Sequence, residues 1–198
     1  MQLDTQGRGF SFLREGPLDM RMDRSLKQTA KEIINRFTEE EIGKIFRDYG
    51  EEPRWRKAAK AIVEARKKKM IATTTELAQI IVNSLGRGAK KKLHPATLIF
   101  QGLRIFVNRE LEAIEKALSQ AIEMVATKGR IGVISFHRLE DRIVKNVFKS
   151  AARPLKKTEA FHPLLKILTK KPIVATMEEM RLNPRARSAK MRFAEKIS

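Results

Sequence analysis

The sequence has no cysteine among its 198 residues, and this absence excludes several kinds of chemistry. Without thiols there is no disulfide scaffold, no thiolate metal site and no cysteine nucleophile. No apolar run approaches the roughly 20 residues of a membrane-spanning helix. The first residues, MQLDTQGRGF, also lack the apolar core of a signal peptide. We therefore expect a cytoplasmic protein that does not enter a membrane.

Histidine is also scarce, with three residues in the chain. His94 and His162 each precede a proline, which favours loop or helix-capping roles, whereas His137 directly follows an apolar run. Three scattered histidines without cysteine do not form a convincing metal site. We therefore expect no bound metal.

The chain lacks a glycine-rich loop of the kind that binds phosphates or nucleotides between a strand and a helix. A parallel sheet needs several buried strands, and residues 131–136 form one strong candidate. We expect that the chain begins part-way through a domain and that a cofactor-binding half of the fold lies outside it.

Positive charge, by contrast, is abundant. Lys and Arg number 42 against 23 Asp and Glu, so the formal net charge is +19. Residues 128–198 hold 18 basic and 6 acidic residues, a net charge of +12. Such an excess attracts polyanions, and non-specific phosphate binding follows from charge alone. An ordinary solvated surface is the alternative, but the size of the excess favours nucleic acid as a partner.

Residues 26–86 show the pattern of a small all-helical unit, because apolar residues recur every three or four positions. The same spacing continues over residues 95–125, which predicts one long helix. Two capping-box patterns mark helix starts in the first region: Thr38 with Glu41, and Thr73 with Glu76.

The remaining chain predicts strands as well as helices. Residues 131–136 are apolar without alternation, which is typical of a strand buried on both faces in a parallel sheet. Helical spacing follows over residues 139–148, and helix, buried strand, helix is the pattern of an α/β layer. Residues 189–197 alternate, which predicts a half-buried antiparallel strand that pairs with residues 164–169 at the sheet edge. A capped helical turn is expected over residues 176–182.

Three short segments carry side chains suited to binding or catalysis: 16–23 (GPLDMRMD), 135–142 (SFHRLEDR) and 183–190 (NPRARSAK). The first is either a charged tight turn or a site with two carboxylates and an arginine. In the second, His137 lies at the carboxyl end of a strand, where ligands bind in open α/β sheets, although the acids after it also suit a first helical turn. The arginines of the third could bind phosphates or protect a sheet edge from aggregation.

Together these segments are far more specific than each is alone. GPLDMRMD, HPATLIFQGLRIFVNREL, GRIGVISFHRLEDRIVK and NPRARSAKMR occur in this order, with MQLD…RGFSF before them and YGEEPRWRKAAKAIVEAR between. The whole chain thereby resembles the bacterial 16S rRNA (cytosine(1402)-N(4))-methyltransferase family (RsmH/MraW). It departs from the family's usual S-F-H-S-L-E-D-R at Arg138, and from H-P-A-T-R-T-F-Q-A at Leu98, Ile99 and Gly102.

The resemblance implies an α/β fold: an incomplete class I (Rossmann-like) methyltransferase domain with an inserted all-α domain. Residues 1–25 match a first segment of the methyltransferase domain, residues 26–98 the inserted helical substrate-recognition domain, and residues 99–198 the C-terminal half of the methyltransferase domain. The implied cofactor is S-adenosylmethionine (AdoMet), and the implied partner is 16S rRNA in the small ribosomal subunit. The prediction leaves room for a homodimer.

The resemblance carries one cofactor-binding residue over, Gln2, because the family's Gly-Gly-His loop and ribose-binding acid have no match here. N4 of cytidine is a poor nucleophile, so catalysis should orient the amino group and accept a proton or hydrogen bonds from it. We expect Asp19, positioned by Arg21, and His137 to be catalytic. Residues expected to contact RNA or the target base are Arg21, Phe136, Arg142, Asn183, Arg185, Arg187 and Lys190.

Two other readings stay open. The chain could be a non-catalytic remnant that binds RNA through its basic surface, or a generic basic, ribosome-associated protein. The ordered motifs disfavour the second reading.

If the main AdoMet-binding half is missing, the isolated chain should bind AdoMet weakly or not at all, and should be inactive alone. Isothermal titration calorimetry of residues 1–198 with AdoMet measures this directly, with a longer family member as the positive control. Micromolar affinity for the isolated chain would contradict the prediction.

Overall fold

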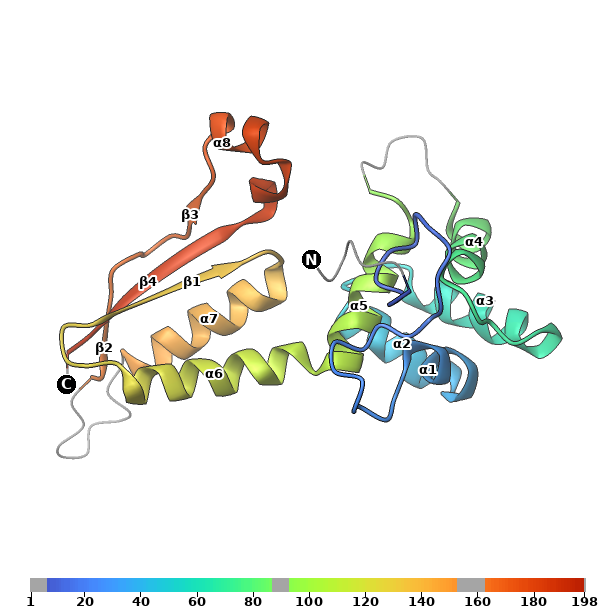
Figure 1. Ribbon diagram of the computed structural model, residues 1–198, viewed down its shortest axis with the longest axis horizontal. Coiled ribbons are helices and arrows are strands. Elements are labelled where there is room, and N and C mark those ends of the chain that lie inside the picture. Colours follow the sequence, from blue (N-terminus) through green and yellow to red (C-terminus); the bar gives the residue numbers. More distant parts are fainter. Residues whose placement is uncertain (1–6, 87–92, 153–162, 198) are drawn as a thin grey trace. The chain divides into compact units, whose positions relative to one another are not determined.

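The computed structural model describes residues 7–86, 93–152 and 163–197 and divides into two compact units. Unit 1 runs from Met1 to Glu110 and unit 2 from Leu111 to Ser198. Figure 1 shows unit 1 as a group of helices with a long N-terminal loop, and unit 2 as a small sheet with helices. Each unit has its own cluster of buried apolar side chains.

Five helices form the described part of unit 1: α1 (Ala30–Arg36), α2 (Glu39–Asp48), α3 (Trp55–Lys68), α4 (Thr74–Leu85) and α5 (Ala96–Asn108). The two predicted capping boxes, at Thr38 and Thr73, are confirmed. A third capping box, at Thr29, starts α1 at Ala30, four residues after the expected start at Leu26. The Thr-x-x-Glu signal for this start is present in the sequence.

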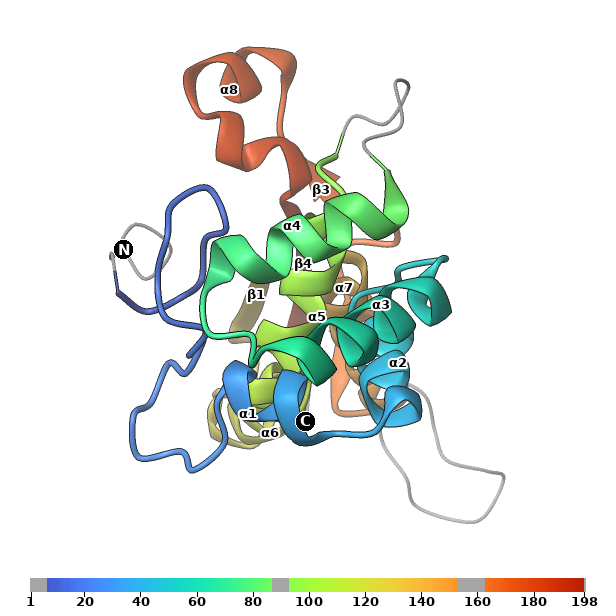
Figure 2. The ribbon, with the colours of Figure 1, turned by 90° about the vertical axis from the view of Figure 1, so that its right-hand side faces the viewer.

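The core of unit 1 lies between these helices. Figure 2 shows α3 between α2 and α4, and α3 buries Ala58, Ala59 and Ile62. Helix α5 buries Ile99 and Leu103 in the same cluster. The segment that opens the expected C-terminal half, α5, therefore packs as a fifth helix of unit 1.

A close approach between the end of α2 and α5 requires two glycines. A Cβ on Gly50 would lie 2.5 Å from the carbonyl oxygen of Leu98, and one on Gly102 would lie 2.9 Å from the backbone nitrogen of Gly50. Real Cβ atoms essentially never show contacts shorter than 3.0 Å, and both of these distances are shorter. The segment after α2 can approach α5 this closely because neither Gly50 nor Gly102 has a side chain.

The long helix predicted over residues 95–125 is wrong, because it breaks at Arg109. This residue adopts a left-handed conformation with φ of 49°, and α6 (Glu110–Met124) begins directly after it. Asn108 donates to the carbonyl oxygens of Met20 and Arg104, and Arg104 holds the Glu110 carboxylate at 2.8 and 2.9 Å. These tertiary contacts stabilise a break that no glycine or proline marks.

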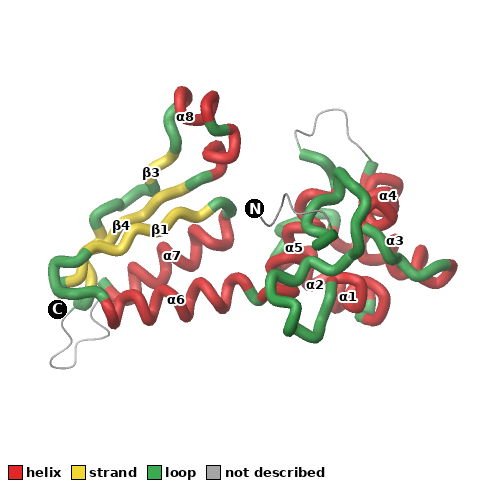
Figure 3. The backbone as a smooth tube through the Cα atoms, viewed as in Figure 1, coloured by secondary structure: helices red, strands yellow, loops and turns green. Residues whose placement is uncertain are grey.

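Unit 2 contains the rest of the elements, which Figure 3 distinguishes by type. They are α6, β1 (Arg130–Ser135), α7 (Arg138–Ala151), β2 (Leu165–Ile167), β3 (Ile173–Val174), α8 (Met177–Leu182), the 3₁₀ helix η2 (Pro184–Ser188) and β4 (Lys190–Lys196). The predicted helical turn after Thr176 is confirmed as α8, and the predicted pairing of β2 with β4 is also confirmed.

The sheet is antiparallel, with β4 at its centre. β4 pairs with β1 on one side and with β2 and β3 on the other. The prediction of an edge position for residues 189–197 is therefore wrong. The prediction that residues 131–136 belong to a parallel sheet is also wrong, because among the described residues β1 has no parallel neighbour. Alternation along β4 comes from its two different faces rather than from an edge position.

Among the described residues of unit 2, helices cover one face of the sheet and leave the other uncovered. The α6 and α7 helices pack on the first face, where Ile131, Ala194 and Phe148 are buried together. On the other face Ile134 is 53% exposed and Ile173 is 52% exposed. The prediction that residues 131–136 are buried on both faces is wrong: apolar residues occupy the uncovered face too, which hides the alternation in burial.

The architecture is a mixed α/β one, with helices and a four-stranded antiparallel sheet. Over the parts of the chain that the structure describes, no helix is both long and apolar enough to cross a membrane.

The Gly50→Ala substitution should destabilise unit 1, because the new methyl group would overlap the Leu98 carbonyl. We expect a loss of roughly 1–3 kcal/mol in the free energy of unfolding, measured in urea by the fluorescence of Trp55. Gly16→Ala is the matched control, since its Cβ would meet nothing closer than 3.9 Å. Equal stability of the two variants would contradict the close approach.

Candidate functional site

The segment of residues 16–23 is a loop held in one conformation by hydrogen bonds to three helices of unit 1. Leu18 accepts from the backbone N–H of Lys31, and Asp19 accepts through its carbonyl from that of Ala30, both at the start of α1. Gly16 accepts from Thr74 at the start of α4. The buried side chains of Leu18 and Met20 anchor the loop in the core.

Within this loop Asp19 and Arg21 form a two-pronged ion pair. The Nε and Nη2 atoms of Arg21 donate to the two carboxylate oxygens of Asp19 at 2.6 and 3.0 Å. The guanidinium also donates to the carbonyl oxygens of Arg24 and Leu26. The hydrogen bond from Arg21 holds the pKa of Asp19 below its usual range. Asp19 is therefore a weak base but a good hydrogen-bond acceptor, and 26% of its side chain is exposed.

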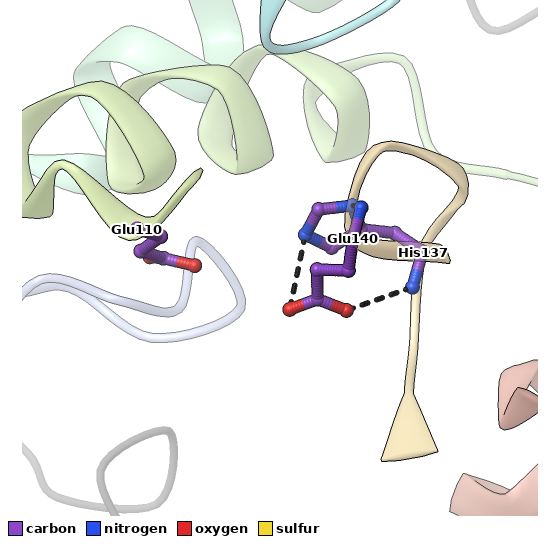
Figure 4. A group of neighbouring side chains, drawn as sticks. All are labelled: Glu110, His137 and Glu140. Atoms are coloured by element: carbon purple, nitrogen blue, oxygen red, sulfur yellow. Dashed lines mark hydrogen bonds and ion pairs between the residues drawn. The ribbon is translucent and has the colours of Figure 1, made fainter. Parts of the chain in front are cut away.

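In unit 2, His137 caps the first turn of α7. Its Nδ1 accepts from the backbone N–H of Glu140. The Glu140 carboxylate accepts from the backbone N–H groups of Phe136 and His137, and Figure 4 draws the second of these bonds. Burial opposes ionisation of Glu140, but the hydrogen bonds to His137 and Phe136 lower its pKa. Glu110, also drawn in Figure 4, belongs to unit 1.

The capping arrangement fixes the imidazole of His137 in a defined state. Because Nδ1 is an acceptor, a neutral ring carries its proton on Nε2. That nitrogen is buried without a hydrogen bond in good geometry, and lies 3.3 Å from Oε1 of Glu140. One ring nitrogen of His137 is thus used by the helix cap, and the other is not satisfied by the described residues.

Asp141, the residue after Glu140 on α7, forms the main ion pair of unit 2. Asp141 accepts from Nε and Nη2 of Arg192 on β4, at 2.7 and 3.1 Å, and both residues are buried. Nζ of Lys190 lies 3.9 Å from the same carboxylate. The hydrogen bond from Arg192 lowers the pKa of Asp141. Through Lys190 and Arg192, Asp141 ties segment 135–142 to β4 and to the end of segment 183–190.

The basic segment of residues 183–190 contains the short helix η2. The Asn183 side chain accepts from the backbone N–H of Arg185, which starts this short helix, and Ala186 anchors it. The side chains of Arg185 and Arg187 are exposed. Their fixed backbone and exposed charged ends suit phosphate contacts.

The structure brings the expected site residues together in two groups. Asp19 and Arg21 are paired in unit 1. At the end of β1 in unit 2, Phe136 is 54% exposed beside His137, and Ser135 donates to the carbonyl of Lys190. Arg142 is exposed one position after Asp141 on α7.

Gln2 and His162 lie outside the described residues. His94 accepts from the backbone N–H of Ala96 at the start of α5, the predicted kind of role.

Sequence reasoning missed two residues that organise these groups. Arg192 was not assigned a partner, and nothing in the local sequence joins it to Asp141. Asn108 holds the candidate loop, accepting from the N–H of Met22 at 2.6 Å. The helical pattern continues past Asn108, so no local signal pointed to this role.

A groove of about 330 Å³ lies between α3 and α4 in unit 1. Its polar lining is largely engaged within itself: Lys69 pairs with Glu76 at 2.8 Å, and Gln79 donates to Asn83 at 2.7 Å. Glu76 also accepts from two backbone N–H groups at the start of α4. The hydrogen bond from Lys69, together with these two, lowers the pKa of Glu76 to about 2. The groove offers mainly apolar contact to a ligand.

Comparison with known proteins identifies the family. The model of the MraW methylase family matches residues 1–197. The chain belongs to this family. MraW-family relatives named "Ribosomal RNA small subunit methyltransferase H" share 49% identity over 204 residues in Protochlamydia amoebophila and 54% over 200 residues in Persephonella marina.

Each of these matches takes in 99% of the chain but 65% and 64%, respectively, of the relative. A third relative with the same name, from Synechocystis, is 50% identical over 99% of the chain and 60% of its own length. The chain thus spans about three fifths to two thirds of these MraW-family proteins.

Asp141→Asn should destabilise unit 2 by roughly 3–5 kcal/mol at neutral pH, because it leaves the buried Arg192 unpaired. The folded-state pKa of Asp141 lies below its ordinary value of 3.8, so the ionised carboxylate stabilises the fold above about pH 4. This contribution disappears as the pH falls below 3.8 and through the folded pKa. The difference between variant and parent should therefore shrink in acid.

Hydrogen exchange of the β1–β4 amides measures this effect within unit 2. Asp48→Asn is the control, since Asp48 pairs with Arg47 at the exposed surface, where such pairs contribute about 1 kcal/mol or less. Unchanged protection in Asp141→Asn at neutral pH would contradict the assigned role of the ion pair.

Proposed function

We propose that this chain is part of an AdoMet-dependent methyltransferase of 16S rRNA, acting on the exocyclic N4 of cytidine 1402. The observation that carries the proposal is the match over residues 1–197 to the MraW methylase family, with about half of the residues identical in relatives named as small-subunit rRNA methyltransferases. The net charge of +19 supports a polyanionic substrate.

In this proposal the candidate residues act on the target base. Asp19, kept ionised and oriented by Arg21, accepts a hydrogen bond from the amino group and directs its lone pair toward the methyl donor. His137, whose ring caps α7 and whose Nε2 is buried, positions the end of β1. Phe136, exposed beside it, offers a surface on which an unstacked base can lie.

Phosphate contacts are assigned to the basic residues of unit 2. Arg185, Arg187 and Arg142 have exposed side chains, and Lys190 is partly exposed beside Asp141. Asn183 fixes the turn that carries two of them. Phosphate contacts of this kind position RNA without reading its sequence.

AdoMet would supply the methyl group, but the α3–α4 groove does not fit it. Its ribose hydroxyls and charged amino-acid end need free polar partners, whereas the polar side chains of the α3–α4 groove are engaged with one another. We therefore place the cofactor-binding residues in the part of the relatives that this chain does not match, together with Gln2.

We also propose how the chain is divided between two domains. Residues 1–25 and 99–198 would be parts of a class I, Rossmann-like methyltransferase domain, and residues 26–98 the inserted substrate-recognition domain. The compact helical unit reaches to Glu110, so we propose that α5 supports the insertion as well as the catalytic domain.

A non-catalytic RNA-binding role is the second candidate. It is favoured by the mismatch between the α3–α4 groove and AdoMet, since the basic surface would remain functional without a cofactor. Methyl transfer distinguishes the two candidates.

The decisive experiment joins the part of the Persephonella relative that this chain does not match ahead of residue 1. We expect the joined protein, but not the isolated chain, to form N4-methylcytidine in unmodified 16S rRNA, measured by mass spectrometry of digested RNA. Asp19→Asn and His137→Ala in the joined protein should each slow transfer by about 100-fold or more.

Lys116→Gln, at an exposed position of α6, is the matched control and should retain full activity. Melting curves show whether each variant is folded. No methylation by the joined protein would contradict the proposed function, whereas full activity of both site variants would contradict the residue roles.

A further inference from the structure

The outer face of α3 carries a row of cations that neither the candidate site nor the segment 183–190 includes. Successive residues of an α-helix are rotated by about 100°, so positions can be placed around its axis. Five basic residues fall within an arc of about 120°, and we call them the α3 stripe: Arg56, Lys57, Lys60, Lys67 and Lys68. All five are exposed.

The opposite face of the same helix is fixed in the core. Ala58, Ala59 and Ile62 are fully buried between α2 and α4. Two other arginines of the segment are turned inward: Arg54 donates to the carbonyl of Leu85 and Arg66 to that of Ile34. The stripe is therefore presented on a rigid helix and not on a mobile loop.

Most of the charge in the stripe is not neutralised within the protein. Lys67 pairs with Glu64, the one acid on this face of α3, at 2.9 Å. Lys57, Lys60 and Lys68 form no ion pair with another described residue. From Lys57 to Lys68 the helix rises about 17 Å, a length that spans several phosphates of a nucleic-acid strand.

Arg56 is held in place by an aromatic ring. Its guanidinium lies 4.1 Å from the centre of the Trp55 ring, and that ring packs on Gly43, where a Cβ would come within 2.7 Å of it. Arg47 lies 5.5 Å from the same ring. A guanidinium held over an aromatic ring by a cation–π contact loses less conformational freedom when it binds a phosphate.

We propose that the α3 stripe binds the phosphate backbone of the RNA substrate, as a second contact surface on unit 1. The proposal rests on the proposed function for the identity of the polyanion. A membrane-binding helix needs a free apolar face beside its basic one, but the apolar face of α3 is buried in the core. Lysine-rich exposed surfaces with a stacked arginine suit sequence-independent phosphate contact.

The test measures binding of the 198-residue chain to a short mixed-sequence single-stranded RNA at several salt concentrations. Trp55, the single tryptophan of the sequence, lies under Arg56 and should change its emission when RNA occupies the stripe. The test variant combines Lys57→Gln, Lys60→Gln and Lys68→Gln, because glutamine retains helix propensity. Circular dichroism verifies its helix content.

Each single-strand phosphate contact contributes about 0.7 to the slope of log K against log salt. The triple variant should therefore lower the magnitude of the slope by about 2, which corresponds to an affinity loss on the order of 100-fold at 0.1 M salt. Replacement of the same lysines by arginine should retain binding. The matched control, Arg24→Gln with Lys27→Gln and Lys44→Gln, removes three exposed charges elsewhere on unit 1 and should change the slope much less.

An equal loss in the control variant would overturn the proposal, because net charge alone would then explain binding. A Trp55 response to phosphatidylserine vesicles that depends on the stripe, without one to RNA, would overturn the assignment to RNA. Neither measurement involves methyl transfer, so the proposed function and the α3 stripe can fail separately.

Discussion

The arrangement of unit 2 depends on the buried ion pair between Asp141 and Arg192. A buried charge is costly unless a partner satisfies it, so the first turn of α7 can lie only where β4 presents the guanidinium. This contact fixes the helix start, and with it the His137 cap and the exposed Phe136 at the end of β1. Two segments that are 51 positions apart in the sequence thereby form one surface.

Unit 1 solves a similar problem with backbone hydrogen bonds. A loop that crosses a protein core must find partners for its peptide groups, and the loop around Asp19 finds them at the starts of α1 and α4 and on the Asn108 side chain. Arg21 completes this network by donating to both the carboxylate and the loop's own carbonyl oxygens. The candidate catalytic carboxylate is consequently held in one orientation without any ligand.

Local signals predicted local structure well. Thr38, Thr73 and Thr176 each start a helix where the pattern indicated, because a capping side chain acts on the backbone within three residues of it. The break at Arg109 could not be predicted, since it depends on contacts to residues far away in the sequence. The burial of residues 131–136 was predicted wrongly for a different reason. Ile134 is apolar but lies on an uncovered face, and hydrophobicity alone does not say which face is covered. For the site, the pairing of Asp19 with Arg21 could be predicted, because the two residues are close in the sequence. The pairing of Asp141 with Arg192 could not, because these residues are far apart in the sequence.

The uncovered side of the sheet in unit 2 has a consequence for how the chain behaves in solution. Exposed apolar residues such as Ile134 and Ile173, beside β1, which pairs with a single strand among the described residues, attract other copies of the same surface. The net charge of +19 opposes such encounters at a distance. This repulsion acts over about 10 Å at 0.1 M salt and about 3 Å at 1 M, so the colloidal stability of the isolated chain is set by ionic strength as much as by its fold.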